Sequence, residues 1–177
     1  MKNLIFPTFV LAALAPACVV HNSAEVRQEI VSADAGEREY LFAPLRALDG
    51  RWEGLDPHGS KQVVEFKLTA NGTALREVMF PGSKEEMTNM YTLDGNSALM
   101  THYCAGGNQP HMRARALDEG RMVFESDGVS DLKSEAEPYM GAMTMVFVSP
   151  NQIEQHWTAY NRGAVDHNAV FLLERVH

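Results

Sequence analysis

Hydrophobic and polar residues alternate in short runs along most of the chain, and residues typical of tight turns separate these runs. Val64, Phe66 and Leu68 alternate with polar neighbours, which is the pattern of a strand with one buried face. The dipeptides Asn71-Gly72 and Asp94-Gly95 mark hairpins, because both tolerate the positive φ angles of two-residue turns. About ten such strands, each joined to the next by a short turn, predict an all-β protein with a single antiparallel up-and-down β-barrel.

One segment ahead of these strands has helical periodicity instead. Between Glu37 and Leu48 the apolar side chains recur at spacings of three and four: Tyr40, Leu41, Leu45 and Leu48. We expect a short N-terminal helix here that plugs one end of the barrel. Pro44 lacks a backbone N–H and is tolerated best where a helix begins, so this prediction places it in the first turn.

The N-terminal residues have the organisation of an export signal. Lys2 precedes an apolar stretch from Leu4 to Leu14, which is too short to span a bilayer. The small residues of Ala15-Pro16-Ala17 then come directly before Cys18. A plain secretory signal would leave Cys18 unmodified after cleavage, whereas a lipoprotein signal would leave it lipidated. We favour the lipoprotein, because a Cys at this place is uncommon in an exported chain whose one other Cys is Cys104.

These boundaries divide the chain into a signal peptide (1–17), a flexible polar tether (18–36) and a barrel domain (37–177). Removing the signal peptide takes away one positive charge, Lys2, so the net charge of −8 becomes −9. An acidic domain of this kind does not attract nucleic acid or anionic lipid. Membrane association is therefore expected only through a lipid anchor on Cys18, on the periplasmic side of a bacterial envelope membrane.

Two residues at opposite ends of the domain resemble the signature of the calycin superfamily, which includes lipocalins. Gly50-Arg51-Trp52 would begin the first strand, and Arg175 lies on the last one. The resemblance implies that the Arg175 guanidinium lies across the indole of Trp52, a cation–π contact that closes the barrel floor. It also implies a lipocalin-like barrel with an internal cavity.

A second resemblance is to a bacterial lipocalin-like family, the domain of unknown function 1579. The matching residues are Met90 to Gly95 and Thr101-His102-Tyr103-Cys104, followed by Gly107-Asn108-Gln109-Pro110. The similarity extends from about Leu48 to the C-terminus. This family brings no established activity with it.

The segment around this motif holds the first group of candidate ligand-binding residues. If residues 105–110 form the loop of a hairpin, Cys104 lies opposite His111, and His102 lies opposite Arg113. These four side chains would then share one face of the sheet. That face either lines a cavity, where Arg113 and the histidines would bind an anionic headgroup, or is solvated exterior. A free Cys favours the interior, because cysteines are usually buried.

The strand from Gln152 to Tyr160 supplies two further candidates. His156 and Tyr160 share one phase, while Trp157 has the opposite phase and is expected in the core. The pattern leaves open whether His156 and Tyr160 face a cavity or water. The sequence contains no metal-binding motif and no nucleophile elbow, so neither a metal site nor an enzyme is favoured.

The sequence thus predicts an exported barrel that binds a small, partly apolar molecule in its cavity. One alternative is a haem protein, because Gly50-Arg51-Trp52-Glu53-Gly54 resembles the motif of nitrobindin-type haem barrels. Asp56 replaces the third Gly of that motif, and no proximal ligand is clearly placed; His167 and His177 lie near the last strand. Another alternative is a structural protein of the cell envelope whose barrel is filled by its own side chains.

Overall fold

The computed structural model describes residues 33–55 and 58–177. The predicted signal peptide, the lipidation site Cys18 and most of the predicted tether lie outside these residues. Helix α1 (Ala35–Arg46) comes first in the described part. Among the described helices, none is both long enough and apolar enough to cross a membrane.

Helix α1 begins earlier than the sequence pattern indicates. The carboxylate of Asp34 accepts hydrogen bonds from the backbone N–H groups of Gly36 (2.8 Å) and Glu37 (3.0 Å) and so caps the helix. The prediction that Pro44 lies in the first turn was wrong, since Pro44 is in the last turn. This early start follows from the cap, because Asp34 satisfies N–H groups that have no partner inside the helix.

Eleven strands follow the helix in the described part of the chain. They are β1 (Gly50–Leu55), β2 (Lys61–Thr69), β3 (Ala74–Met79), β4 (Met87–Asp94), β5 (Ser97–Tyr103), β6 (Gln109–Ala114), β7 (Leu117–Asp118), β8 (Arg121–Ser130), β9 (Tyr139–Ser149), β10 (Gln152–Asn161) and β11 (Ala164–Arg175). A short 3₁₀ turn, η1 (Ala70–Gly72), joins β2 to β3. Its residue Asn71 has a φ of 54° and Gly72 has a φ of 79°, as expected for an Asn-Gly turn.

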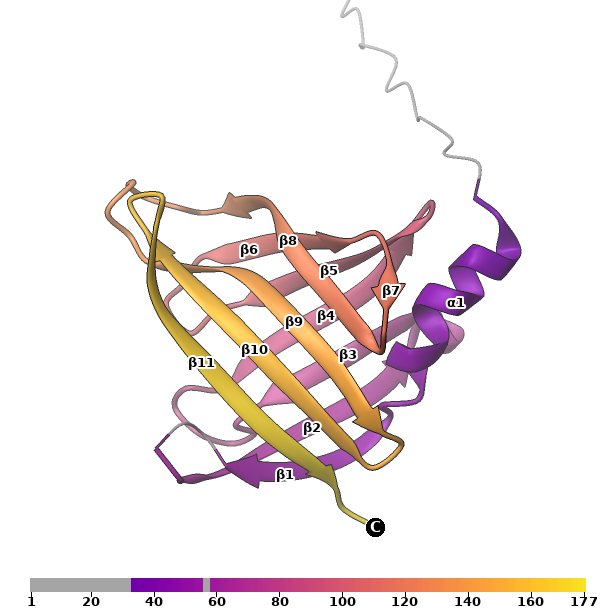
Figure 1. Ribbon diagram of the computed structural model, residues 1–177. Coiled ribbons are helices and arrows are strands. Elements are labelled where there is room, and N and C mark those ends of the chain that lie inside the picture. The colour runs from indigo at the N-terminus through magenta and orange to yellow at the C-terminus, as the bar shows by residue number, and fades with distance from the viewer. Residues whose placement is uncertain (1–32, 56–57) are drawn as a thin grey trace, which may run out of the picture. The chain divides into compact units, whose positions relative to one another are not determined.

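The strands form one antiparallel sheet that closes on itself (Figure 1). The order is β6-β5-β4-β3-β2-β1-β11-β10-β9-β8, and pairing between β6 and β8 completes the ring. Strand β7 has two residues and extends the sheet beside β8, so ten strands make the closed barrel. The predicted all-β, single antiparallel barrel of about ten strands with a short N-terminal helix is therefore confirmed.

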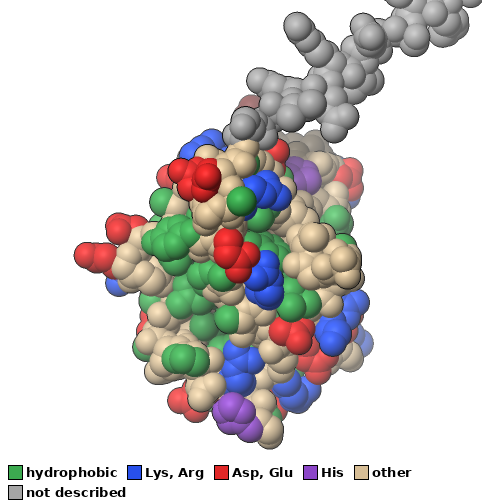
Figure 2. Space-filling model, turned by 90° about the vertical axis from the view of Figure 1, so that its right-hand side faces the viewer, with side chains coloured by type: hydrophobic (Ala, Val, Ile, Leu, Met, Phe, Trp, Pro, Cys, Tyr) green, Lys and Arg blue, Asp and Glu red, His purple; other side chains and the backbone are tan. Residues whose placement is uncertain are grey.

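Helix α1 covers one end of the barrel, which we call the closed end. Leu41, Phe42 and Leu45 on α1 are buried in the same core cluster as Trp52. The Arg38 guanidinium donates to the carbonyl of Gly95 in the β4–β5 hairpin at 3.1 Å, which fixes the helix at this end. Figure 2 shows this side of the molecule, where hydrophobic side chains are interleaved with acidic and basic ones.

The predicted contact between Trp52 and Arg175 is present at the closed end. The two residues are direct pairing partners between β1 and β11, and the guanidinium carbon lies 4.3 Å from the centre of the indole ring. The same guanidinium donates to the carbonyls of Asp49 (2.8 Å) and Ala47 (2.5 Å), just beyond α1. The indole N–H of Trp52 donates to the carbonyl of Leu48 at 2.8 Å. These bonds join the first strand, the last strand and the end of the helix.

The register of the β5–β6 hairpin differs from the prediction. Thr101, not Cys104, lies opposite His111, and Leu99, not His102, lies opposite Arg113. The loop has three residues, because the N–H of Cys104 donates to the carbonyl of Asn108 at 3.2 Å and Gly107 takes a φ of 96°. The prediction placed residues 105–110 in the loop, three more than the structure has, and this odd difference moved the side chains of one strand to the wrong face.

Candidate functional site

Five polar side chains meet inside the barrel and form what we call the interior cluster: Glu77, Asn89, Tyr91, His102 and Gln155. Each is at most 1% exposed to solvent. They come from β3, β4, β5 and β10, strands that lie on different sides of the closed sheet. The cluster therefore bridges the interior of the barrel.

The carboxyl group of Glu77 is the centre of this cluster. One of its oxygens accepts hydrogen bonds from the Tyr91 hydroxyl (2.5 Å) and from the side-chain amide of Asn89 (2.7 Å). The other oxygen accepts from the Gln155 amide at 2.7 Å, across 78 positions of sequence. Three donors from two sides of the barrel thus converge on one buried carboxyl group.

His102 joins the cluster through Asn89. The Nδ1 atom of His102 lies 2.6 Å from Oδ1 of Asn89, whose amide nitrogen already donates to Glu77. Because that Oδ1 atom is an acceptor, the network assigns the imidazole proton to Nδ1. The imidazole ring also lies against Trp157 of β10, with ring centres 5.0 Å apart.

Burial changes the acid–base properties of the cluster. It lowers the pKa of His102 from 6.5 to about 4, so this side chain is neutral at physiological pH. It raises the pKa of Glu77, although the hydrogen bonds from Tyr91, Gln155 and Asn89 act in the opposite direction. It also raises the pKa of Tyr91, which lies beside the Glu77 carboxylate.

Three buried polar atoms in and beside the cluster have no hydrogen-bond partner in the protein. They are Nε2 of His102, Oε1 of Gln155 and Nε1 of Trp157. Gln155 and Trp157 lie on the same face of β10, and Trp157 contacts His102. Because an unpaired buried polar atom costs about 1–3 kcal/mol, a further hydrogen-bond partner for these atoms, either a water molecule or a ligand group, would lower the free energy of the folded protein.

The cluster lies nearer the end of the barrel opposite α1, which we call the open end. Glu77 and His102 come just before the ends of β3 and β5, and Asn89 comes just after the start of β4. A groove of about 560 Å³ lies at this end, with Phe80, Ala169 and Phe171 among its lining residues. In the sheet Phe171 is the direct partner of Gln155. The groove is therefore adjacent to the interior cluster.

Of the candidate residues from the β5–β6 segment, His102 belongs to the cluster and the others do not. His111 lies on the outer face, where its ring nitrogens are 3.2 Å from the Thr101 hydroxyl and 2.8 Å from the Ser130 hydroxyl. Arg113 is also outside. It forms ion pairs with Asp94 (2.9 Å) and Asp127 (3.0 Å). The prediction that His102, His111 and Arg113 share one face was wrong because of the shifted register.

The remaining candidates lie at the loop or on the exterior. Cys104 is a half-buried free thiol that accepts from the N–H of Gly106 at 3.4 Å. His156 is exposed and lies 2.7 Å from a carboxylate oxygen of Glu154. Tyr160 stacks on Tyr139 outside the barrel, with ring centres 6.0 Å apart. The prediction that Trp157 faces the core is correct, since it is 2% exposed.

Four members of the cluster were missed at the sequence level, and the sequence contains a signal for every one except Tyr91. Glu77 lies between Leu75 and Met79 in strand phase, so it is a charged residue among inward-facing apolar ones. Asn89 is likewise two positions from Tyr91, and Gln155 is two positions from Trp157. A polar residue in the apolar phase of a strand is therefore the signal for this site.

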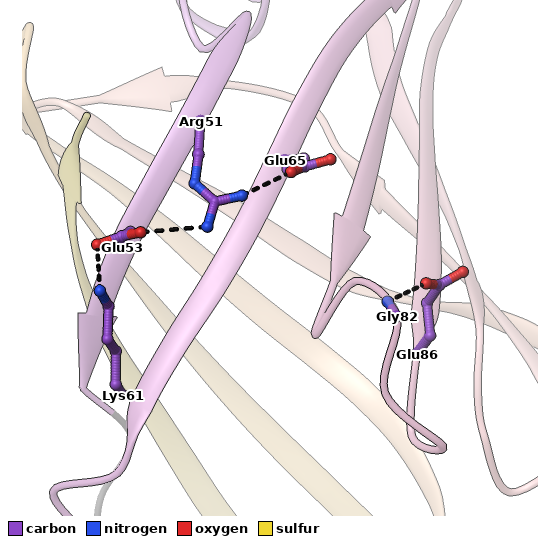
Figure 3. A network of polar contacts seen from close by, with 6 residues as sticks. All are labelled: Arg51, Glu53, Lys61, Glu65, Gly82 and Glu86. Atoms are coloured by element: carbon purple, nitrogen blue, oxygen red, sulfur yellow. Dashed lines mark hydrogen bonds and ion pairs between the residues drawn. The ribbon is translucent and has the colours of Figure 1, made fainter. Parts of the chain in front are cut away.

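Charged side chains on the outer surface form a different kind of network. On β1 and β2 the Arg51 guanidinium bonds to Glu65 (2.8 Å) and to Glu53 (3.2 Å), and Glu53 also pairs with Lys61 at 2.7 Å (Figure 3). These groups face water, where ion pairs contribute little to stability. Within residues 33–55 and 58–177, no three His, Cys, Asp or Glu side chains gather as metal ligands would.

Comparison with known proteins adds a structural likeness at low sequence identity. No protein-family model and no curated protein sequence matches the chain. A crystal structure of a protein of unknown function from the DUF3598 family of Nostoc punctiforme is similar, with a TM-score of 0.46 and 16% sequence identity. The match covers 75% of this chain and 49% of that protein, so this chain spans about half of its length.

Proposed function

We propose that this protein binds a small, partly apolar molecule inside its barrel, with the polar part of that molecule against the interior cluster. The observation that carries the proposal is the set of unpaired buried atoms on His102, Gln155 and Trp157. The groove at the open end supports it, because Phe80 and Phe171 offer apolar surface next to the cluster. Ligand sites commonly combine apolar walls with a few convergent polar groups.

The backbone at the entrance is consistent with this function. Phe80 has a φ of 56°, a conformation that costs energy for a non-glycine residue. Its ring lies 5.9 Å from that of Phe171, so the two aromatic side chains meet over the groove. A ligand that reaches the cluster from the open end would displace this pair.

The cellular setting is proposed from the sequence. The apolar segment Leu4 to Leu14 and the small residues before Cys18 support an exported, lipid-anchored protein in a bacterial envelope. The overall resemblance to the domain of unknown function 1579 fits that setting. The substitution Cys18→Ser should shift the protein from the membrane fraction to the soluble fraction, because the acyl chain would supply most of the attachment to the membrane.

Native mass spectrometry of protein purified from its own host tests ligand binding. We expect a small molecule to accompany the wild-type chain and to be lost from His102→Leu, which removes an interior polar group. His156→Leu is the matched control, because this histidine is on the exterior, and it should retain the molecule. If neither the wild-type protein nor the control carries a ligand, and added amphiphiles do not bind, the barrel is filled by its own side chains and has a structural role.

Haem binding is the second candidate, supported by one feature of the groove. His167 lines it, and Nδ1 of this residue lies 2.8 Å from the Asp166 carboxylate, an arrangement that orients metal-binding histidines. The haem propionates do not fit, because Glu85 is the one charged side chain apart from the histidines among the described residues that line the groove. A Soret band after haem supply, absent from His167→Ala, would favour haem over the amphiphile.

A further inference from the structure

The hydrogen bonds within the interior cluster determine which atoms are left for a ligand. This inference rests on the proposed function and concerns the chemistry of the ligand's polar group. The carboxyl oxygens of Glu77 accept the amide hydrogens of Asn89 and Gln155. Asn89 therefore turns its oxygen toward His102, and Gln155 is left with an unpaired oxygen. Glu77 thus orients both amide side chains.

Two of the three unpaired atoms are acceptors and one is a donor. The Nδ1 atom of His102 carries the proton that Asn89 accepts, so Nε2 of the neutral ring is an acceptor. The free oxygen of Gln155 is the second acceptor. The indole N–H of Trp157 is the donor. A complementary ligand group must offer two hydrogens and accept one.

We infer that the ligand presents an uncharged primary carboxamide to the interior cluster. Its two N–H hydrogens match Nε2 of His102 and Oε1 of Gln155, and its carbonyl oxygen matches the indole N–H of Trp157. The apolar part of the ligand then extends toward the open end, past Phe171, which is paired with Gln155 in the sheet, and along the groove beside Phe80.

The other common headgroups match this set less well. A carboxylate offers acceptors alone, so it would face two acceptor atoms and lie near the Glu77 carboxyl. An ammonium offers donors but no acceptor for the Trp157 N–H. An alcohol has one hydrogen and leaves one acceptor unpaired. This selectivity reverses the expectation from the sequence, in which Arg113 and the histidines would bind an anion.

Four probes of equal chain length test the inference on the full-length protein: octanamide, octanoate, octylamine and 1-octanol. Binding is followed by the NMR signal of the Trp157 indole N–H, which is assigned with Trp157→Phe. This assignment is simple because the chain has two tryptophans. We expect octanamide to shift the signal and to bind about tenfold or more tightly than octanoate, since the carboxylate would leave both buried acceptors unpaired.

A matched pair of variants tests the role of the indole N–H itself. Trp157→Phe keeps an aromatic ring in the core but removes the donor, so calorimetry should show a reduced preference for octanamide over 1-octanol. Tyr160→Phe changes an exterior ring on the same strand and should leave the preference unchanged. An unchanged preference in Trp157→Phe would overturn the inference.

The outcomes separate this inference from the proposed function. If octanoate or octylamine shifts the Trp157 signal and binds as tightly as octanamide, the barrel binds amphiphiles but the carboxamide assignment is wrong. If none of the four probes shifts the signal or binds, the proposed function is wrong as well. A water molecule, which also offers two hydrogens and one acceptor, would then be the partner of these three atoms.

Discussion

The two tryptophans of the chain lie in two regions of the barrel, which differ in whether the buried indole N–H has a hydrogen-bond partner in the protein. At the closed end the indole N–H of Trp52 bonds to the Leu48 carbonyl, and the Arg175 guanidinium covers the ring. Toward the open end the indole N–H of Trp157 is buried without a partner, and a neutral histidine lies against the ring. In the first region the protein supplies the hydrogen-bond partner of the indole, and in the second region it does not.

The two regions also differ in what their hydrogen bonds hold together. At the closed end the Arg175 guanidinium donates to three backbone carbonyls, those of Ala47, Asp49 and Pro150. These bonds hold the end of α1 and a neighbouring turn against the barrel. The bonds of the interior cluster instead converge on Glu77, a buried acid with no described basic partner. Burying such a group costs free energy, and proteins retain that cost where a site needs it.

The largest expected effect comes from breaking the closed end. Trp52→Ala should lower the free energy of unfolding by about 3–5 kcal/mol, because it removes a large buried side chain. Arg175→Ala should cost less. The two losses should be non-additive in chemical denaturation, with a coupling of about 0.5–3 kcal/mol, because the groups are in contact. Fully additive losses would show that the contact does not stabilise the floor.

The next largest effect is a pH dependence that arises in the interior cluster. Because the folded pKa of His102 is about 4 and its ordinary value is 6.5, its contribution to stability is complete above pH 6.5 and is lost as the pH falls toward 4. At about 1.4 kcal/mol per pKa unit, the loss is about 3 kcal/mol. Urea unfolding at several pH values should therefore show a smaller acid loss in His102→Gln than in the wild type.

The comparison with His102→Gln is needed because Glu77 changes the stability with pH in the opposite direction. Its raised pKa means that the folded state holds a proton more tightly, so its contribution to stability grows as the pH falls. Both proteins contain Glu77, and the difference between them isolates His102. Identical acid profiles for the wild type and His102→Gln would contradict the buried, neutral state of this histidine.

A conservative change in the cluster should have an intermediate effect. Tyr91→Phe removes the hydroxyl that donates to Glu77 at 2.5 Å. A hydrogen bond to a carboxylate contributes more than one to a protonated carboxyl group, about 1.5–3 against about 0.5–1.5 kcal/mol, so the loss of stability should be larger at a pH above the raised pKa of Glu77. The loss should shrink as the pH falls and Glu77 takes up a proton. Tyr139→Phe, on the exterior stack, is the control and should change stability little at any pH.

The sequence predicted the barrel because its strands depend on local patterns, and the resemblance to calycins implied the contact at the closed end. Alternation and turn dipeptides identify strands, and the two residues of the floor lie at recognisable places on the first and last strands. The site depends on register, which changes with the length of one loop. Because Asn108 pairs with Cys104, the loop is three residues shorter than predicted, and this odd shift places His111 and Arg113 on the exterior. The contacts of Glu77 with Gln155 join strands far apart in sequence, and no local pattern contains them.

The smallest effect is expected on the exterior, where the sequence had placed a ligand-binding arginine. Arg113 pairs with Asp94 and Asp127 on the outer face. Exposed ion pairs contribute about 0.2–1 kcal/mol and are weakened by salt, so Arg113→Ala should change stability by less than about 1 kcal/mol. It should leave the affinity for octanamide and for octanoate unchanged in titration calorimetry, in contrast to Trp157→Phe. A selective loss of octanoate binding in Arg113→Ala would instead mean that the outer face of β6 binds the ligand and that the interior cluster does not.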